Sequence, residues 1–247
     1  MNPRFYCPNL GSAPNTVVGA AIELPDTAAH HATRVLRLRI GDPVTLFNGA
    51  GREWQGTLAS ANRSVEVVIT AETPGIAEPD LHITLVQSLP SGDKMDWIVQ
   101  KAVELGVTRI QPVAAKRSVV KLDGDRARKR ITHWQEIAVS ACEQCGRNTV
   151  PQILPLLNLD QYFAVPPSDG EQRFLLAPDA KHRLRSMSAP DGRITLLIGP
   201  EGGFDEAESL RARTAGFAPL QLGPRVLRTE TAGLAAIAAM MALWGDV

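Results

Sequence analysis

The first third of the chain consists of short apolar and β-branched runs separated by polar, glycine-rich turns. Such runs are typical of strands, and the Asn-Gly-Ala-Gly segment at 48–51 is a turn between two of them. Short strands with turns of this kind predict a small β-barrel. We expect strands at 44–47, 54–58 and 64–70, and one short helix at 30–38.

The pattern changes after a segment that has two prolines, a glycine and no periodicity, and we predict a linker at 75–80. A strand at 81–87 is followed by a helix that Asp93 can cap and Gly106 can end, and then by a strand at 107–113. The apolar positions of this helix recur at helical spacing, at Met95, Ile98, Val99, Ala102 and Leu105. A strand, helix and strand in this order predict a parallel sheet.

The same alternation continues to the end of the chain. A long helix has apolar side chains on one face and ends near Gly146, and Asp205 with Glu208 resembles a capping box. Further strands are predicted at 174–177, 195–198 and 220–222, and further helices at 205–215 and 231–244. The fold class predicted for this part is α/β with a parallel sheet.

Composition narrows the classes of protein that fit. The 247 residues are 44% hydrophobic and 21% charged, as in ordinary globular proteins and unlike disordered chains. The start of the chain has no apolar signal region, and the apolar run at 232–244 is shorter than the roughly 20 residues of a membrane span. Three cysteines cannot form a secreted disulfide framework, so we expect a cytoplasmic protein without a membrane partner.

Cys142 and Cys145 form a CxxC pair near the end of the long helix. No second cysteine pair or spaced histidine pair completes a zinc site, and a redox CxxC usually opens a helix. We therefore predict no metal, and interpret both as helix cysteines.

The net charge is zero, from 26 basic and 26 acidic side chains, but the charges are segregated. Residues 81–130 contain ten Lys and Arg against five Asp and Glu, and the remaining segments are mildly acidic. In the first domain Arg34, Arg37 and Arg39 follow one another without an acidic residue. Such clusters are candidate phosphate contacts, although solvated helix faces explain single positions equally well.

The segment 198–204 (IGPEGGF) is a glycine-rich loop between a strand and a helix. It matches no nucleotide phosphate loop, since Glu201 would repel a pyrophosphate and Pro200 lacks an N–H donor. It is either a plain strand–helix turn or a loop for a ligand without phosphate. S-adenosylmethionine, which carries a sulfonium and an ammonium, is a ligand of that kind.

A second polar loop, 222–232 (LGPRVLRTETA), also follows a predicted strand. It carries two arginines and an acidic residue just before an apolar helix, where Thr229 or Glu230 could simply cap that helix. Loops after neighbouring parallel strands are nevertheless where α/β sheets bind ligands.

Taken together these segments resemble the RsmE family of ribosomal RNA uridine-N3 methyltransferases, in the SPOUT superfamily. Matching segments occur in order along nearly the whole chain. They are 3–6 (PRFY), 31–38 (HATRVLRL), 92–95 (GDKM), 100–107 (QKAVELGV), 117–119 (RSV), 141–151 (ACEQCGRNTVP), 198–204 and 222–232.

The resemblance implies a PUA-like RNA-binding β-barrel at 1–74 and a SPOUT methyltransferase domain at 81–247, with a deep trefoil knot at about 195–247. It implies S-adenosylmethionine as cofactor and a homodimer as the working form. The substrate would be 16S rRNA or the assembled small ribosomal subunit, methylated at N3 of a uridine in the decoding region.

The resemblance also implies roles for single residues. The cofactor residues would be Ile198, Gly199, Glu201, Gly202, Leu222, Gly223, Leu227 and Arg228. For catalysis Arg228 is the first choice, Arg4 from the barrel of either subunit the second, and Glu230 a proton acceptor or an orienter of Arg228. The RNA contacts would be Arg4, Arg34, Arg37, Arg39, Lys94, Arg117 and Lys121.

Three alternatives stay open at this point. A SPOUT enzyme with another rRNA target is the nearest one. A non-catalytic RNA-binding or assembly protein would share the basic segments but would not bind the methyl donor. A nucleotide-dependent oxidoreductase would need a phosphate loop that the sequence lacks.

Overall fold

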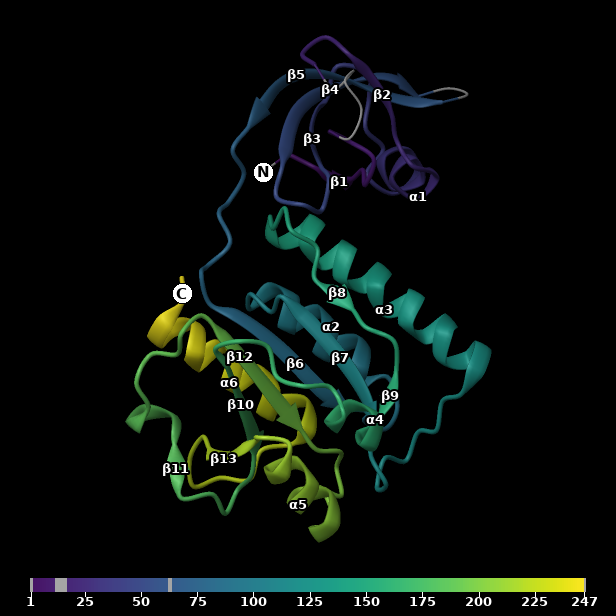
Figure 1. Ribbon diagram of the computed structural model, residues 1–247. Coiled ribbons are helices and arrows are strands. Elements are labelled where there is room, and N and C mark those ends of the chain that lie inside the picture. Colours follow the sequence, from purple (N-terminus) through teal and green to yellow (C-terminus); the bar gives the residue numbers. More distant parts are fainter. Residues whose placement is uncertain (1, 12–16, 62–63, 247) are drawn as a thin grey trace. The chain divides into compact units, whose positions relative to one another are not determined.

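The computed structural model describes residues 2–11, 17–61 and 64–246 (Figure 1). The chain folds into two compact units, one formed by Met1–Glu78 with Val139–Val150 and the other by Pro79–Ala138 with Pro151–Val247. The first unit thus includes the end of the long helix α3 (Gly124–Cys145) as well as the amino-terminal strands.

A curled five-stranded sheet, a half-barrel, forms the first unit, in the order β1-β3-β4-β5-β2. Its strands are β1 (Arg4–Tyr6), β2 (Ala21–Glu23), β3 (Pro43–Phe47), β4 (Glu53–Ala61) and β5 (Val65–Thr73). The predicted strands are therefore confirmed, and β1 and β2 are additions. Alternate side chains such as Trp54 and Leu58 are buried in its core. The short helix predicted at 30–38 lies earlier in the chain, as α1 (Asp26–His30) continued by a π-helical turn, η1 (His31–Val35), and residues 36–38 are not helical.

The cysteines of the CxxC pair lie in the last turn of α3 and belong to the first unit. Both are free thiols, Cys142 fully buried and Cys145 partly buried. Burial raises the pKa of Cys142 to about 12, so its thiol stays protonated at neutral pH. This placement agrees with the interpretation of both residues as helix cysteines.

The second unit is a parallel α/β sheet in the order β11-β13-β10-β12-β6-β7-β8, with β9 paired to β7 (Figure 1). The strands are β6 (His82–Ser88), β7 (Arg109–Ala114), β8 (Gln152–Ile153), β9 (Leu157–Asn158), β10 (Glu171–Leu176), β11 (His182–Arg183), β12 (Arg193–Ile198) and β13 (Ala218–Gln221). Every predicted strand of this domain is present, and the two-residue strands are additions.

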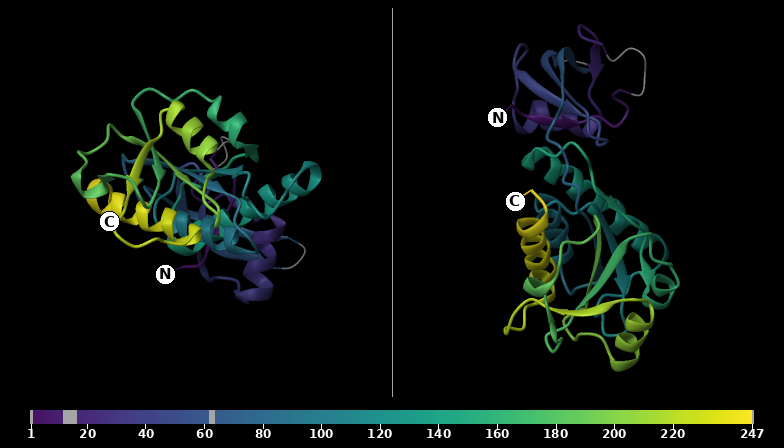
Figure 2. Two further views of the ribbon diagram at one scale, coloured as in Figure 1. Left: turned by 90° about the horizontal axis from the view of Figure 1, so that it is seen from below. Right: turned by 60° about the vertical axis from the view of Figure 1, so that its left-hand side comes forward.

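Helices cover both faces of this sheet. On one face α6 (Thr229–Trp244) packs against α2 (Lys94–Glu104) and against β6 and β12, and Figure 2 shows α6 in yellow beside the strands. On the other face α4 (Leu159–Phe163) and α5 (Glu206–Thr214) share an apolar cluster with the strands. A 3-10 turn, η2 (Leu184–Ser186), follows β11.

Local signals in the sequence are confirmed at most helix ends. Asp205 and Glu208 form a reciprocal capping box at the start of α5, and Gly106, with φ +90°, ends α2 in the left-handed region. Asp93 stands at the amino-terminal cap of α2 as predicted, but its side chain makes no capping hydrogen bond. The trefoil knot at about 195–247 is a property of threading rather than of strand pairing, and stays a prediction.

Glycine allows α6 to lie close to the sheet. A Cβ at Gly233 would stand 3.1 Å from Leu85 Cδ1 and 3.3 Å from Ile198 Cγ1. Both distances are tighter than most side-chain contacts, so a methyl group here would have to displace a strand residue or the helix.

Candidate active site

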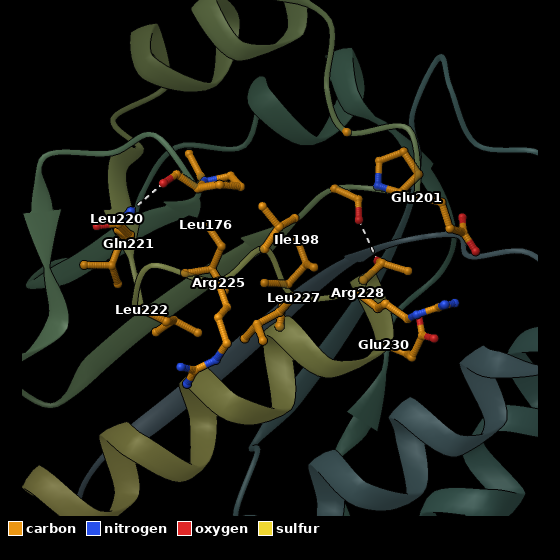
Figure 3. Close-up of a pocket in the computed structure, with 18 of the residues that line it drawn as sticks. Leu176, Ile198, Glu201, Leu220, Gln221, Leu222, Arg225, Leu227, Arg228 and Glu230 are labelled. Atoms are coloured by element: carbon orange, nitrogen blue, oxygen red, sulfur yellow. Dashed lines mark hydrogen bonds between the residues drawn. The ribbon is translucent and has the colours of Figure 1, made fainter.

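A cavity of about 420 Å³ lies at the carboxyl ends of β10, β12 and β13 (Figure 3). Three loops line it, at 176–178, 198–203 and 220–232, together with Lys94 from the start of α2. This is the edge at which parallel α/β sheets bind their ligands.

The lining divides into an apolar part and a charged part. Figure 3 shows Leu176, Ile198 and Leu227 on the apolar side, and Glu201, Arg228 and Glu230 grouped at the other end. Backbone of the glycine-rich segments completes the wall. The cavity therefore suits a ligand with one flat apolar portion and one charged portion.

Glu201 is held by hydrogen bonds across the cavity mouth. Its Oε1 accepts from Ser91 N at 2.9 Å, from Ser91 Oγ at 2.7 Å and from Lys94 Nζ at 2.9 Å. Partial burial raises the pKa of Glu201, but the bonds from Ser91 and Lys94 outweigh it and lower the pKa to about 2. Glu201 is therefore a carboxylate at any physiological pH.

Lys94 bridges two carboxylates, because its Nζ also lies 3.5 Å from Glu230 Oε2. The hydrogen bond to Glu201 raises the pKa of Lys94, and Glu230 adds to the effect. Within the described residues, Glu230 Oε2 is buried and accepts no hydrogen bond. The carboxylates of Glu201 and Glu230, with the cations of Lys94 and Arg228 beside them, place acceptors for a cationic ligand at this end of the cavity.

Arg228 stands at the amino-terminal cap of α6, exposed to solvent, and makes no side-chain capping bond. Neither Thr229 nor Glu230 occupies that cap position, so neither takes the capping role that remained open from the sequence. Figure 3 shows the side chains of Arg228 and Glu230 next to each other at the charged end. A cation and a hydrogen-bond acceptor thus stand together at the cavity mouth.

Two buried residues tie the cavity loops together: Thr229, which the sequence offered only as a helix cap, and Gln87, which it did not single out. Thr229 Oγ1 donates to Gly199 O at 2.6 Å and accepts from Gln87 Nε2 at 3.0 Å. Gln87 is fully buried in β6, a strand otherwise rich in apolar residues. A polar side chain inside a buried parallel strand is the signal that could have identified it.

Comparisons with known proteins agree with this geometry. An RNA methyltransferase domain model matches residues 77–241, and an RNA methyltransferase PUA domain model matches residues 24–70. The chain belongs to the RNA methyltransferase family. Among its relatives, the ribosomal RNA small subunit methyltransferase E of Bacillus subtilis is 34% identical, over 85% of this chain and 86% of that one. Its counterpart from Buchnera aphidicola of Acyrthosiphon pisum is 31% identical, over 90% of this chain and 88% of that one.

Solved structures of family members have the same fold. The small subunit methyltransferase E of Neisseria gonorrhoeae, crystallised with S-adenosylmethionine, superposes with a TM-score of 0.90 at 44% identity, covering 100% of this chain and 99% of that one. A structure from Legionella pneumophila, also with S-adenosylmethionine, gives 0.92 at 35% identity and covers 100% of both chains.

The structure brings most of the predicted cofactor residues of this RNA methyltransferase into the cavity. Seven of them line it: Ile198, Gly199, Glu201, Leu222, Gly223, Leu227 and Arg228. Gly202 does not, because its carbonyl accepts from Arg117 Nη1 at 2.8 Å and its Cα packs on the Arg117 side chain. Gly203, with φ +63°, lines the cavity instead.

The predicted RNA contacts are not all free on the surface. Arg34, Arg37 and Arg39 are exposed in the first unit, and Lys121 is exposed in the second. Lys94 and Arg117 instead hold the cavity loop through Glu201 and Gly202. Both cations make contacts with the protein itself, although Arg117 remains exposed, and the sequence could not reveal these contacts.

Arg4 is buried within the first unit. Its guanidinium pairs with Glu53 at 2.6 Å, donates to Asn148 Oδ1, and lies 5.1 Å from the Phe47 ring centroid. The surrounding charges and hydrogen bonds, led by Arg4, lower the pKa of Glu53 against the effect of its burial. These contacts favour a structural role for Arg4 over the catalytic and RNA-binding roles predicted for it.

No group of three or more His, Cys, Asp or Glu side chains that could hold a metal ion occurs among the described residues. Across the same residues, no helix is both long enough and apolar enough to span a membrane.

Proposed function

We propose that this chain transfers a methyl group from S-adenosylmethionine to N3 of a uridine in 16S rRNA of the small ribosomal subunit. The observation that carries the proposal is the cavity at 198–203 and 220–232, with carboxylates on its wall and Arg228 at its mouth. The small-subunit methyltransferases with which the chain shares its fold along its full length support the substrate class.

The residues present fit S-adenosylmethionine. The apolar side chains of Ile198 and Leu227 suit a flat purine, and the carboxylates of Glu201 and Glu230 suit a cationic sulfonium or ammonium. The buried Oε2 of Glu230, which pairs with Lys94 at 3.5 Å but accepts no hydrogen bond, is a second acceptor for such a group. When bound, this cofactor supplies a methyl group that is already activated for transfer, so the protein's main task is alignment.

The protein's own side chains then act on the uridine. N3 carries an imide proton that must leave as the new bond forms, and Glu230, which lines the cavity, is the proposed proton acceptor. Loss of that proton spreads negative charge over O2 and O4 of the base. The exposed guanidinium of Arg228 is the group proposed to stabilise this charge, and Glu230, whose side chain lies next to it, is the proposed orienter of Arg228. A paired target base would first have to leave its helix.

We further propose that Arg34, Arg37, Arg39 and Lys121 contact RNA phosphates, because all four are exposed. Changing Arg34 or Arg37 to Glu should weaken RNA binding and flatten its dependence on log salt by about one unit per lost contact. Filter binding at several salt concentrations checks this. An unchanged slope would remove these residues from the RNA interface.

A homodimer is the proposed working form. The helices α2 and α6 pack together and expose large apolar side chains, Trp97 at 46% and Leu243 at 53%. Covering such side chains is a common reason for self-association. Sedimentation equilibrium on the wild type and on a Leu243→Glu variant tests this, and a wild-type monomer at micromolar concentration would contradict it.

Mass spectrometry of 16S rRNA from a strain lacking the gene tests the reaction. We expect one uridine to lose a methyl group, and purified protein with S-adenosylmethionine to restore it on isolated small subunits in a cytoplasmic extract. A methyl group lost from a ribose or another base would favour a different SPOUT target. Unchanged rRNA would favour a non-catalytic assembly protein.

A further inference from the structure

Four neighbouring strands of the parallel sheet change from polar to apolar side chains along one face. On the face covered by α4 and α5, each strand has a polar side chain near its amino end and an apolar one two residues later, on the same side. The pairs are Arg173 with Leu175, Thr195 with Leu197, Thr84 with Val86, and Gln111 with Val113. Parallel strands are usually apolar on both faces, so the polar half calls for a reason.

The polar halves line a second cavity, of about 440 Å³, which we call the amino-end cavity. Another part of its wall is formed by Tyr162 of α4 and by Val165 and Ser168, which follow that helix. It shares no lining residue with the candidate active site, which lies at the opposite ends of the same strands. Burial of so many polar groups costs free energy unless they serve packing or a ligand.

One buried ion pair within the cavity is satisfied by the protein. Arg173 Nε donates to Glu171 Oε1 at 2.9 Å, and both side chains are at most 10% exposed. Glu171 also accepts from Thr195 Oγ1 at 2.7 Å and from Ser168 N at 2.7 Å. Burial opposes ionisation of Glu171, but these bonds lower its pKa, so the pair is charged and internally neutral.

The rim of the cavity carries positive charge that the protein does not neutralise. Arg109 and Arg193 are exposed, and within the described residues neither forms an ion pair or a side-chain hydrogen bond. Strand register places Arg193 opposite His82, and Arg109 opposite Thr84 on the next strand. Two strand spacings and two residues separate the arginines, about 12 Å between Cα atoms, so they flank one opening.

The interior offers hydroxyl and amide groups rather than further charge. Tyr162 is only 7% exposed, and its hydroxyl has no hydrogen-bond partner among the described residues. Burial raises the pKa of Tyr162 to about 12, so it remains a hydrogen-bond donor. Thr84 and Thr108 lie on the same wall, and Thr108 Oγ1, which donates to Ile83 O at 2.9 Å, still has room to accept. This interior matches a ligand rich in hydroxyl groups.

We propose that the amino-end cavity binds a phosphorylated sugar, with the phosphate between Arg109 and Arg193 and the sugar hydroxyls against Tyr162 and the threonines. Two arginines match the double negative charge of a phosphomonoester, and the guanidinium fork suits phosphate oxygens. The volume is within the range of small-molecule sites. The phosphomonoester can come from a free sugar phosphate or from the 5′ end of an RNA.

Titration calorimetry with ribose 5-phosphate and with ribose tests the site. We expect ribose 5-phosphate to bind at least tenfold more tightly than ribose, and the double variant Arg109→Ala, Arg193→Ala to lose at least tenfold in affinity. Arg213→Ala, which removes an equally exposed arginine from α5, should have no effect. Arg228→Ala should also leave this binding unchanged, since Arg228 belongs to the other cavity.

Short RNAs that carry a 5′-phosphate or a 5′-hydroxyl distinguish the two sources. Tighter binding of the 5′-phosphorylated RNA, lost in the double variant, assigns the site to an RNA end. Binding of ribose 5-phosphate without that preference assigns it to a free sugar phosphate. Equal binding of ribose and ribose 5-phosphate, full binding by the folded double variant, or no binding of either phosphate probe at millimolar concentration would overturn the proposal.

Discussion

The two ends of the parallel sheet are built in opposite ways. At the carboxyl ends the cavity wall consists mainly of loops, so backbone and exposed side chains such as Arg228 face the ligand. At the amino ends the wall consists largely of side chains from the strands themselves, several of them buried. A loop residue can change without disturbing the sheet, whereas a buried strand residue cannot. Substitutions at the carboxyl end should therefore be able to change activity without changing stability, whereas substitutions at the amino end should change stability as well.

The largest effect on stability is expected at the amino end. Arg173→Met should lower the free energy of unfolding by about 3–5 kcal/mol, because it leaves Glu171 charged and buried without its partner. Chemical denaturation measures the loss. The paired change Arg173→Met with Glu171→Gln should recover much of the lost stability. If Arg173→Met alone is as stable as the wild type, stability does not depend more strongly on the amino-end residues.

At the carboxyl end Arg228→Ala should lower the methyl-transfer rate by about 10²–10³-fold, the usual cost of losing one group that stabilises developing negative charge. Its thermal unfolding should be unchanged, because the side chain is exposed. Arg225→Ala is the matched control, since Arg225 is also exposed and lines the same cavity. The measurement is the rate of methyl transfer to isolated small subunits. A rate for Arg228→Ala within twofold of the wild type would remove Arg228 from the mechanism.

Thr229 is a buried residue at the carboxyl end, so a substitution there should change both stability and ligand binding. Thr229→Val should cost about 1–3 kcal/mol, since Gly199 O loses the Thr229 hydroxyl and Gln87 Nε2 keeps only its bond to Ser88 O. Affinity for S-adenosylmethionine should fall as well, because the Gly199 loop is no longer tied to α6. Calorimetry and thermal unfolding measure the two effects, and Thr229→Ser should restore both. An unchanged affinity of Thr229→Val for S-adenosylmethionine would argue against a positioning role.

The smallest effect concerns pH. The pKa of Glu201 is about 2 in the folded protein against an ordinary 4.5, so its charged form stabilises the fold. This contribution is complete above about pH 5 and is lost as pH falls toward 2. Glu201→Gln should therefore be less stable than the wild type at pH 7, and the difference should shrink by pH 3. A constant difference between pH 7 and pH 3 would show that the carboxylate charge contributes nothing.

Patterns in the sequence predicted those elements that local physics determines. The parallel sheet followed from apolar strands that alternate with helices, and the capping box of Asp205 and Glu208 from two residues alone. The two-residue strands β8, β9 and β11 have no periodicity of their own. They form by pairing with the edge of a neighbouring strand, so no local sequence pattern predicts them.

The parts of the site that lie in a continuous loop motif could be predicted from the sequence. The contacts between residues far apart in the chain could not. The IGPEGGF and LGPRVLRTETA motifs identified most of the cavity wall. In contrast, the bonds of Lys94 to Glu201, of Arg117 to Gly202 and of Arg4 to Glu53 join residues far apart in the chain. A basic residue looks the same in a sequence whether it faces RNA or a carboxylate of its own protein. The polar half of the sheet was likewise hidden, because each strand contributes only one or two of its side chains.

The close approach of α6 at Gly233 has a consequence for the cavity. Arg228, Thr229 and Glu230 begin the same helix whose distance from β6 and β12 depends on the missing side chain at 233. The size of the residue at 233 therefore influences how far the start of α6 lies from the strands, although position 233 is not part of the cavity wall. A side chain added at 233 would press on Ile198 of the cavity wall and on Leu85, and so would alter the cavity from behind its lining.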